Sequence, residues 1–268
     1  MKQIITWLII LGSINLLLFI LGILFFIPRE KLKLKKSECF KIIKNQLPYI
    51  LIIIGVVIFH LIQVNVIDPH LTGYDYTNNI RNFEGDIVYW FSQHWTPILV
   101  YFFVIMYIAV YPFTLWFSPL YFLLTNNKKA MKNLSYGLLI IYIIALPFYL
   151  FLPITNVYTY YNIKSALEST IPSVESFFYT TTTQNNCLPS LHTAMTILIA
   201  YSISLTGYKK LTYFSYFVAI TIIISVIYLS IHWIMDIITG AILALGVIII
   251  LRKILKEEKY EKNRKKST

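Results

Sequence analysis

The chain has 268 residues, of which 57% are hydrophobic and 13% are charged, and its mean hydropathy is +0.68. Because the apolar residues fall into long blocks, this composition excludes a soluble globular domain. The formal net charge of +11 does not indicate nucleic-acid binding, since the aromatic residues lie in the apolar blocks and not among the basic residues.

The apolar blocks are long enough to cross a bilayer. A helix needs about 20 mostly apolar residues to span roughly 30 Å of hydrocarbon. The sequence therefore predicts an all-α fold, a polytopic transmembrane helical bundle of about seven spans. They lie near residues 4–27, 48–67, 96–117, 134–153, 190–206, 211–229 and 233–251.

The basic residues predict how this bundle is oriented. All but three of the 23 Lys and Arg residues fall in 29–44, 128–132, 209–210 and 252–266, which are alternate loops. Cytoplasmic loops carry an excess of such residues, so we expect this side and the tail 252–268 to be cytoplasmic and to contact anionic lipid head groups. An odd number of spans then places the N-terminus on the opposite side of the membrane, most simply the cell membrane.

The N-terminal part, 1–95, is predicted to hold two spans, a basic inner segment and a long outer loop. Apolar residues interleaved with lysines between 30 and 46 predict a helix that lies on the membrane surface. The outer loop carries Arg81, a cation on a side that is otherwise poor in cations. Pairing with Glu84 or Asp86 would explain Arg81, and contact with an anionic ligand is the alternative.

A helical core is predicted over 96–251. Its second span ends at Pro153, and Asn156 and Tyr158 follow directly. The outer loop that comes next carries Lys164. These polar side chains and Arg81 are expected on the same side of the membrane.

A short polar motif, 187–193 with the sequence CLPSLHT, opens the next span. Pro189 suits the first turn of a helix. The backbone N–H groups beside Ser190 would face outward and form an anion site, as helix N-termini do. His192 would lie one turn into the helix, close to any bound anion.

A second polar motif lies within the apolar run 211–251. One straight helix of this length would measure about 60 Å, twice the hydrocarbon thickness, so the run must fold back, and the polar residues 230–236 predict the turn. His232 and Asp236 are four residues apart, so the carboxylate can reach the ring, fix its tautomer and stabilise an imidazolium. This predicts His232 as a nucleophile and His192 as a general acid. The alternative is that both histidines only bond neighbouring helices.

The motifs Pro189-Ser190-Leu191-His192 and His232-x-x-x-Asp236 resemble the second and third signature motifs of the type 2 phosphatidic acid phosphatase (PAP2) superfamily. Leu191, where most members have Gly, is similar to the branch that contains inositol phosphorylceramide synthases. The resemblance covers about 96–251 and implies metal-free phosphoryl transfer through a phosphohistidine. It implies that His232 attacks phosphorus, Asp236 orients it, His192 protonates the leaving group and Ser190 helps to hold the phosphate.

The sequence departs from this family pattern in its cations. The family's first motif supplies a Lys and an Arg, whereas 152–156 has neither, and the Arg that usually follows Ser in the third motif is Val226 here. Phosphate charge still needs compensation. We therefore expect Arg81 or Lys164 to contact the phosphate, with Asn156 and Tyr158 as neutral donors.

These features predict a membrane lipid phosphate phosphatase that acts on a phospholipid or polyprenyl (di)phosphate at the outer face. One alternative is a phosphotransferase that moves a phosphoryl head group to a lipid alcohol, and another is a non-catalytic scaffold or carrier. The expected partners are a lipid phosphate substrate and membrane lipids, without nucleic acid. No cofactor and no metal is expected, because no metal-ligand spacing is present.

Overall fold

The computed structural model describes residues 2–33, 35–70 and 73–264. These ranges form helices joined by short loops. In chain order the elements are α1 (Lys2–Phe26), η1 (Arg29–Lys33), α2 (Lys36–Ile62), η2 (Gln63–Ile67), η3 (Asp68–His70), α3 (Thr77–Glu84), α4 (Ile87–Gln93), α5 (Pro97–Ile105), η4 (Met106–Val110), α6 (Tyr111–Leu124), α7 (Lys128–Phe151), α8 (Val157–Tyr160), α9 (Ala166–Thr170), α10 (Val174–Phe178), α11 (Leu191–Ser204), α12 (Lys209–Tyr228) and α13 (Ile234–Arg264).

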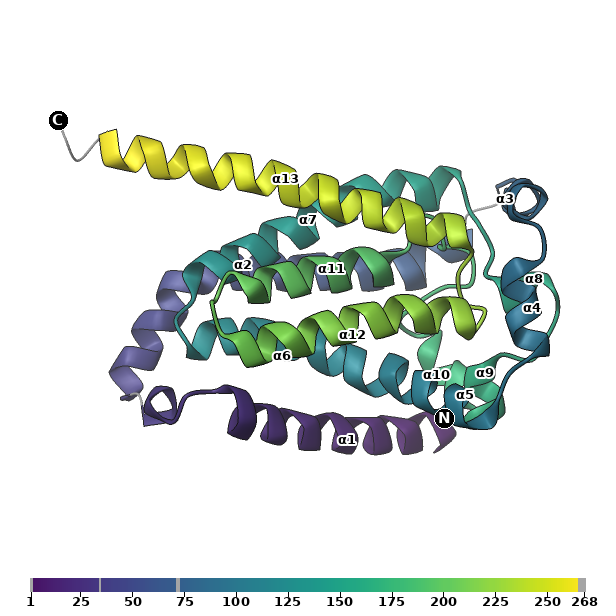
Figure 1. Cartoon of the computed structure of the whole chain (residues 1–268), viewed down its shortest axis with the longest axis horizontal. Helices are drawn as coiled ribbons and strands as arrows, with labels where there is room; N and C mark the ends of the chain where they lie inside the picture. The colour runs from purple at the N-terminus through teal and green to yellow at the C-terminus, as the bar shows by residue number, and fades with distance from the viewer. Residues whose placement is uncertain (1, 34, 71–72, 265–268) are drawn as a thin grey trace.

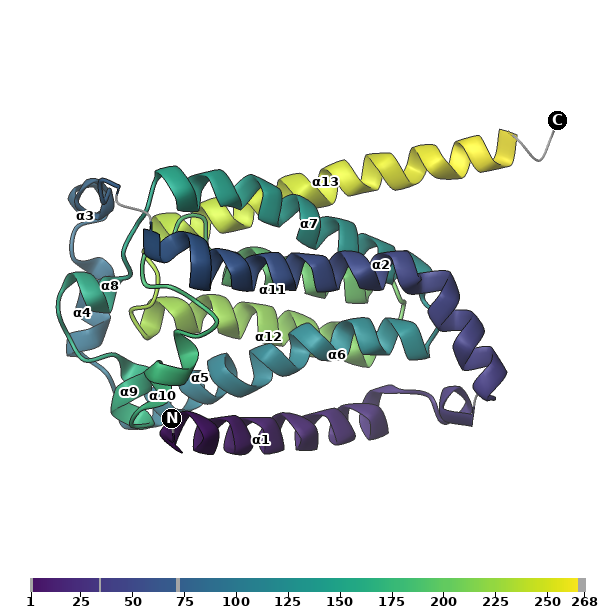
Figure 2. The same ribbon diagram turned by 180° about the vertical axis from the view of Figure 1, so that it is seen from behind.

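Within the described ranges, six helical segments are long and apolar enough to cross a membrane. They are α1, α2 with its extension to His70, the continuous run from α5 to α6, α7, α12 and the first part of α13. The predicted all-α polytopic bundle is confirmed. The predicted span 190–206 corresponds to α11, which has 14 residues and is therefore about 21 Å long. It runs along the same axis as its neighbours (Figures 1 and 2).

The predicted surface segment 30–46 is not a separate helix. It consists of η1 and the first turns of α2, and Figure 2 shows these turns at an angle to the rest of α2. Pro48 lies inside the helix. A proline removes one backbone hydrogen bond and crowds the preceding turn, which accounts for the bend.

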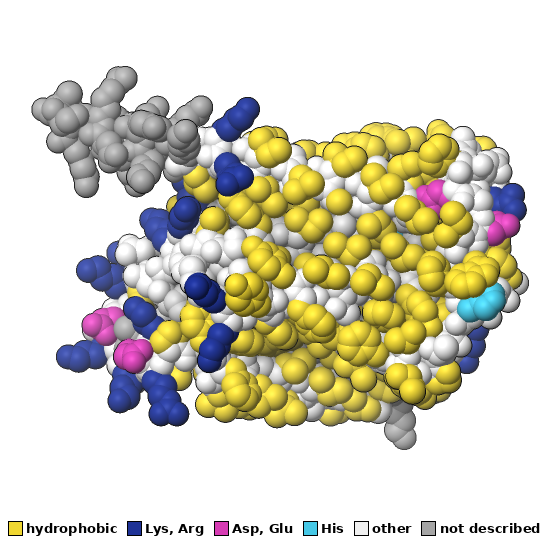
Figure 3. All heavy atoms as spheres, viewed as in Figure 1, with side chains coloured by type: hydrophobic (Ala, Val, Ile, Leu, Met, Phe, Trp, Pro, Cys, Tyr) yellow, Lys and Arg dark blue, Asp and Glu magenta, His cyan; other side chains and the backbone are white. Residues whose placement is uncertain are grey.

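The two ends of the bundle differ in structure and in charge. The short helices α3, α4, α8, α9 and α10 gather at one end (Figures 1 and 2). Most of the Lys and Arg side chains in Figure 3 gather at the other end, where α2 begins and α13 leaves the bundle, and hydrophobic side chains cover the surface between. This is the charge pattern of a protein whose apolar belt lies in a bilayer.

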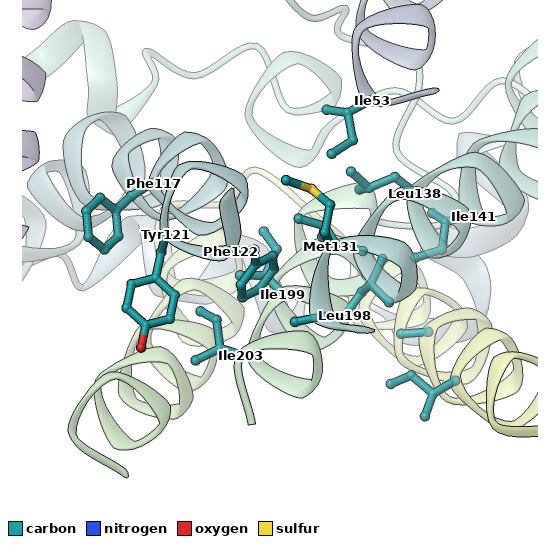
Figure 4. Packing of buried hydrophobic residues seen from close by; sticks show 14 of the residues in the cluster. Ile53, Phe117, Tyr121, Phe122, Met131, Leu138, Ile141, Leu198, Ile199 and Ile203 are labelled. Carbon is teal, nitrogen blue, oxygen red and sulfur yellow. The ribbon is translucent and has the colours of Figure 1, made fainter. Parts of the chain in front are cut away.

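Helix α11 packs in the middle of the bundle, against α7, α12 and α13. Leu198 and Ile199 are buried and belong to the main core cluster together with Phe122 of α6 and Met131 of α7 (Figure 4). A Cβ at Gly137 of α7 would lie 2.5 Å from Leu198, so a small residue allows the two helices to approach. In lipid, close packing of this kind holds helices together.

The apolar run 211–251 folds back as predicted. Helix α12 ends at Tyr228 and α13 begins at Ile234. The backbone of Ser230 in the turn has a φ of 58°, a left-handed conformation that short polar residues tolerate. The turn thereby places the second polar motif at the same end of the bundle as the start of α11.

Candidate active site

His232 and Asp236 form a buried hydrogen-bonded pair where the turn enters α13. His232 Nδ1 lies 3.1 Å from Asp236 Oδ2, and the side chains are 4% and 0% exposed. The same carboxylate oxygen accepts a hydrogen bond from the backbone N–H of Trp233 at 2.9 Å. The pair fixes the ring of His232 by Nδ1, which leaves Nε2 as the nitrogen that can react.

His192 meets this pair from α11. Its Nδ1 lies 3.2 Å from His232 Nε2, and its Nε2 lies 3.0 Å from the Tyr107 hydroxyl oxygen. The structure thus brings together the three residues predicted to carry the chemistry. The helix begins later than predicted, because Ser190 is the N-cap. Pro189 therefore lies outside the helix, and its assignment to the first turn was wrong.

Ser190 connects the start of α11 to Asp236. Its backbone N–H donates to the Asp236 carbonyl oxygen at 3.0 Å, and its hydroxyl oxygen accepts from the Thr193 N–H at 3.3 Å. The first N–H groups of a helix have no carbonyl partner within it. Those of Leu191 and His192 are therefore the backbone donors that an anion can use beside the two histidines.

Gly240 allows α13 to lie against the start of α11. A Cβ built at this position would be 2.5 Å from the Ser190 carbonyl oxygen and 3.2 Å from Thr193 Cβ. Gly240 is one turn after Asp236 on the same helix. The close approach therefore helps to set the separation between Asp236 and the helix that carries His192.

Glu84 caps the start of α13 from the end of α3. Its carboxylate accepts hydrogen bonds from the backbone N–H of Ile234, at 2.8 Å, and of Met235. A negative charge is favourable at a helix N-terminus. Burial nevertheless raises the pKa of Glu84 above its ordinary value. The segment that contains α3 is thereby attached to the helix that holds Asp236.

The segment 153–156, where the family's first motif would lie, is also attached to the site. Ile154 pairs with Asn186, and the Thr155 carbonyl oxygen accepts a hydrogen bond from the indole of Trp233 at 2.9 Å. The segment therefore joins Asn186, which directly precedes the CLPSLHT motif, to Trp233, which directly follows His232. Its contacts are structural.

The two predicted neutral phosphate donors lie in this region and are buried. The Asn156 side chain accepts from the Thr159 N–H at 2.9 Å and caps α8. Tyr158 belongs to a core cluster, and its backbone N–H donates to the Ser230 carbonyl oxygen at 3.2 Å. Both residues thus support the turn before His232.

The two predicted cations lie at the surface of the same end. Arg81 Nε and Nη2 lie 3.1 and 3.3 Å from the carboxylate of Asp86, which also accepts a hydrogen bond from the Tyr161 hydroxyl. Arg81 is one turn before Glu84 on α3, so it is close to the part of the loop that reaches α13. The side chain of Lys164 is exposed.

One group of potential metal ligands coincides with the pair. The ligand atoms of Cys187, His232 and Asp236 lie within 4.8 Å of one another. His232 Nδ1 and Asp236 are already hydrogen-bonded, and burial raises the pKa of the Cys187 thiol well above its ordinary value. The thiol is therefore neutral as the structure stands. The hydrogen bond between His232 and Asp236 accounts for the closeness of these two side chains without a metal.

Three residues that the sequence did not assign to the site contact it: Tyr107, Glu84 and Trp233. The contacts of Tyr107 and Glu84 join segments far apart in the chain, with separations of 85 residues for Tyr107 and His192 and 150 for Glu84 and Ile234. The position of Trp233 beside His232 was the one available signal. Tyr107 stands in an apolar span among other aromatic residues and gives none.

The arrangement suits nucleophilic chemistry at a histidine. His232 has a carboxylate on one nitrogen and a second histidine at the other, which is the arrangement of a nucleophile and an acid–base group. Among known families, the model of the PAP2 superfamily matches residues 81–250. No curated protein and no solved structure gave a significant match.

Proposed function

The chain belongs to the PAP2 superfamily, whose model covers more than half of it, and on this premise we propose that it is a membrane enzyme that removes phosphate from a lipid phosphate through a phosphohistidine. The substrate class is a phospholipid or polyprenyl (di)phosphate. The reaction takes place at the outer membrane face.

The observation that carries the proposal is the sequence of contacts from Asp236 through His232 to His192. Their separations of 3.1 and 3.2 Å are hydrogen-bond distances. Two histidines that serve only to join helices would not require a buried carboxylate on one of them. Burial of this carboxylate is costly unless it is paired, and His232 becomes the stronger nucleophile for that pairing.

In the first step, His232 Nε2 attacks phosphorus and forms a P–N bond. The bond from phosphorus to the lipid oxygen breaks, and His192 transfers a proton to that oxygen. An in-line arrangement separates the two reacting histidine nitrogens by about 6 Å, from a contact of roughly 3 Å on each side of the transferred group. The hydrogen bond between His192 Nδ1 and His232 Nε2 must therefore break, and the two nitrogens must move apart, when the phosphoryl group binds between them.

In the second step, water attacks the phosphohistidine. His192, now neutral, takes a proton from the water, the P–N bond breaks and inorganic phosphate is released. Asp236 stabilises the positive charge on His232 in both steps. The N–H groups of Leu191 and His192 are placed to bind phosphate oxygens, and Ser190 supports them as the cap.

The outer-face assignment is supported by charge. Most of the Lys and Arg side chains in Figure 3 lie at the end of the bundle where α2 begins and α13 leaves it, whereas His192 and His232 lie at the start of α11 and directly before α13. Lys and Arg are enriched on the cytoplasmic side. The negative charge of a bound phosphate requires compensation. Arg81 and Lys164 are candidates, because they lie at the same end of the bundle as the two histidines. Replacing both with Gln is expected to raise KM at least about 10-fold, because each contact with a charged group contributes roughly 1.5–3 kcal/mol. An unchanged KM and unchanged turnover in that double variant would exclude both cations.

The decisive experiment compares the purified wild type with His232→Ala in detergent, using a lipid labelled in its phosphate. After a basic quench, which preserves phosphohistidine, the wild-type protein is expected to carry label. The variant is expected to have no turnover and to carry no label. His94→Ala is the matched control, since His94 is on the same end of the molecule and exposed. Wild-type turnover in His232→Ala would instead support a non-catalytic scaffold or carrier.

A phosphotransferase is the second candidate, favoured by Leu191 in the PSLH motif. It would use the same intermediate and replace water by a lipid alcohol, as in inositol phosphorylceramide synthesis. The same labelled lipid, incubated with candidate lipid alcohols, distinguishes the two reactions. Label in free phosphate supports the phosphatase, and label in a new lipid supports the transferase.

A further inference from the structure

Tyr107 lies in an unusual turn of the helix that faces His192. The run from α5 to α6 contains η4, a single π-helical turn that includes Tyr107. Such turns often mark functional sites. Tyr107 is 2% exposed, and its hydroxyl oxygen lies 3.0 Å from His192 Nε2. A buried tyrosine hydroxyl requires a hydrogen-bond partner, and His192 is that partner.

The contact continues the hydrogen bonds of the active site. Tyr107, His192, His232 and Asp236 are joined by separations of 3.0, 3.2 and 3.1 Å. Each histidine uses both ring nitrogens. The hydroxyl therefore lies at one end of a four-residue chain and the carboxylate at the other.

The direction of the donors in this chain follows from the carboxylate. An ionised carboxylate only accepts, so His232 donates from Nδ1 and presents an unprotonated Nε2. His192 must then donate from Nδ1, and the remaining nitrogen, Nε2, must accept. Tyr107 is the donor to it. This is the arrangement that supplies one proton to every contact while both histidines are neutral.

We propose that Tyr107 is a positioning residue that fixes the tautomer and the orientation of His192. The proposal rests on the proposed function. In the resting site, Tyr107 keeps the proton of His192 on Nδ1, the nitrogen that faces His232 and the incoming substrate. The acid group is thereby held with its proton toward the bond that must break.

A hydroxyl suits this position because it can both donate and accept. When the anionic phosphate binds, His192 takes up a proton from solvent at Nε2 and becomes an imidazolium. Its Nε2–H then donates to the Tyr107 oxygen, while Nδ1–H is given to the leaving oxygen. After the transfer His192 is neutral and keeps Nε2–H, so the contact with Tyr107 remains and Nδ1 is ready to take a proton from water. Phenylalanine would leave Nε2 without a partner in both states.

Tyr111 provides a matched control. Its ring centroid lies 5.3 Å from that of His192, close to the 5.0 Å of Tyr107. Its hydroxyl, however, lies 3.5 Å from the sulfur of Met195. The two tyrosines thus pack against the same ring, and one of them bonds to it.

Other titratable groups also face His192 from the elements around it. His232, before α13, and His60 on α2 affect its protonation, and Asp236 is paired with His232. Tyr111 on α6 packs against the ring, and Tyr149 on α7 bonds to the Pro189 carbonyl oxygen. Tyr107→Phe changes none of these other groups. A change in the titration of His192 in that variant therefore reports on the lost hydroxyl.

The kinetic test compares Tyr107→Phe and Tyr111→Phe as purified proteins. Tyr107→Phe is expected to lower kcat about 10- to 100-fold, which is part of the roughly 10²–10⁴-fold that a general acid supplies. It should change KM little and shift the limb of the pH profile of kcat that belongs to His192. Tyr111→Phe should remain within about twofold of wild type. Equal losses in the two variants, or a wild-type pH profile in Tyr107→Phe, would overturn the proposal.

A measurement independent of turnover separates this proposal from the proposed function. In protein labelled with ¹⁵N at histidine, the His192 signals, identified by their loss in His192→Gln, should show protonated Nδ1 and unprotonated Nε2 in wild type. This pattern should change in Tyr107→Phe and persist in Tyr111→Phe. If no lipid phosphate is turned over and the ¹⁵N pattern still depends on Tyr107, the reaction is wrong and the positioning role stands. A pattern unchanged in Tyr107→Phe contradicts the role itself.

Discussion

Asp236 makes contacts both through its carboxylate and through its backbone. Its Oδ2 atom accepts from the His232 ring and from the Trp233 backbone, while its backbone carbonyl oxygen accepts from the Ser190 N–H. One residue thereby holds the ring of the proposed nucleophile and attaches the start of the helix that carries the proposed acid. The consequence is that changes at Asp236 should affect chemistry more than folding, provided that the backbone stays in place.

The first prediction concerns this carboxylate. Asp236→Asn keeps the size of the side chain, but its amide can donate to His232 Nδ1 and leave the proton on Nε2, which then cannot attack. We expect kcat to fall at least about 100-fold, with loss of the base-stable label on the protein. A melting temperature near that of wild type is the control, and turnover within a few-fold of wild type would contradict the assigned role.

The second prediction concerns pH and the ion pair at the surface. The Tyr161 hydroxyl and the Arg81 guanidinium hold the pKa of Asp86 below its usual range. A carboxyl group whose pKa is lower in the folded state stabilises the fold above its ordinary pKa of about 4, and this contribution is lost as the pH falls. The effect is small because the group is exposed. Wild type and Asp86→Asn should therefore differ slightly in melting temperature near pH 7, and this gap should shrink as the pH falls from about 4 through the lowered pKa. A gap that does not shrink with falling pH would show that the ionised pair does not stabilise the fold.

At the scale of elements, the site depends on how α11 and α13 meet. Gly240 of α13 leaves room for the Ser190 carbonyl oxygen and for Thr193 at the start of α11. Its place in the chain gave no sign of this role, because the residues around it in α13 are mostly apolar. The sequence did predict the fold-back and the end of the bundle at which the two motifs meet. The sequence could not predict the distance between α11 and α13, because this distance depends on contacts between residues far apart in the chain.

The third prediction tests this contact. Gly240→Ala places a methyl group 2.5 Å from the Ser190 carbonyl oxygen, so α11 and α13 must separate. We expect kcat to fall at least about 10-fold, because a misplacement of 1 Å can cost about 100-fold. Gly246→Ala on the same helix is the control, since nothing lies within 4 Å of its added Cβ. Equal activity in the two variants would show that the contact does not set the geometry of the site.

At the scale of the whole molecule, composition predicted the class of protein. Blocks of about 20 apolar residues are a direct result of bilayer thickness, and for this reason six of the seven predicted spans agree with helices of the described residues that are long enough to cross a membrane. The seventh, 190–206, corresponds to the shorter helix α11. The attachment of the loops at the site end through Glu84, Thr155 and Trp233 was not predicted, because no periodic pattern marks such contacts. His192, His232 and Asp236 were found from spacing, and Tyr107 required the structure.

The fourth prediction tests orientation. In a background with Cys39 replaced by Ser, a single cysteine is introduced at Lys164 or at Lys129. Cys187 is buried and neutral, so it should not react with a maleimide. Lys164→Cys should react with a membrane-impermeant maleimide in intact cells, and Lys129→Cys only after the membrane is opened. The opposite pattern would place the site on the cytoplasmic side.

The close approach of α11 and α13 at Gly240 also has a consequence for sequence conservation among relatives. A position with no room for a side chain tolerates few substitutions. Relatives that keep the same packing should therefore carry glycine four residues after the aspartate, while Leu191, which lies beside the reacting groups, remains free to change with the acceptor. The spacing His-x-x-x-Asp-x-x-x-Gly is thus expected to mark shared architecture, and the residue before the acid histidine to mark divergence in substrate.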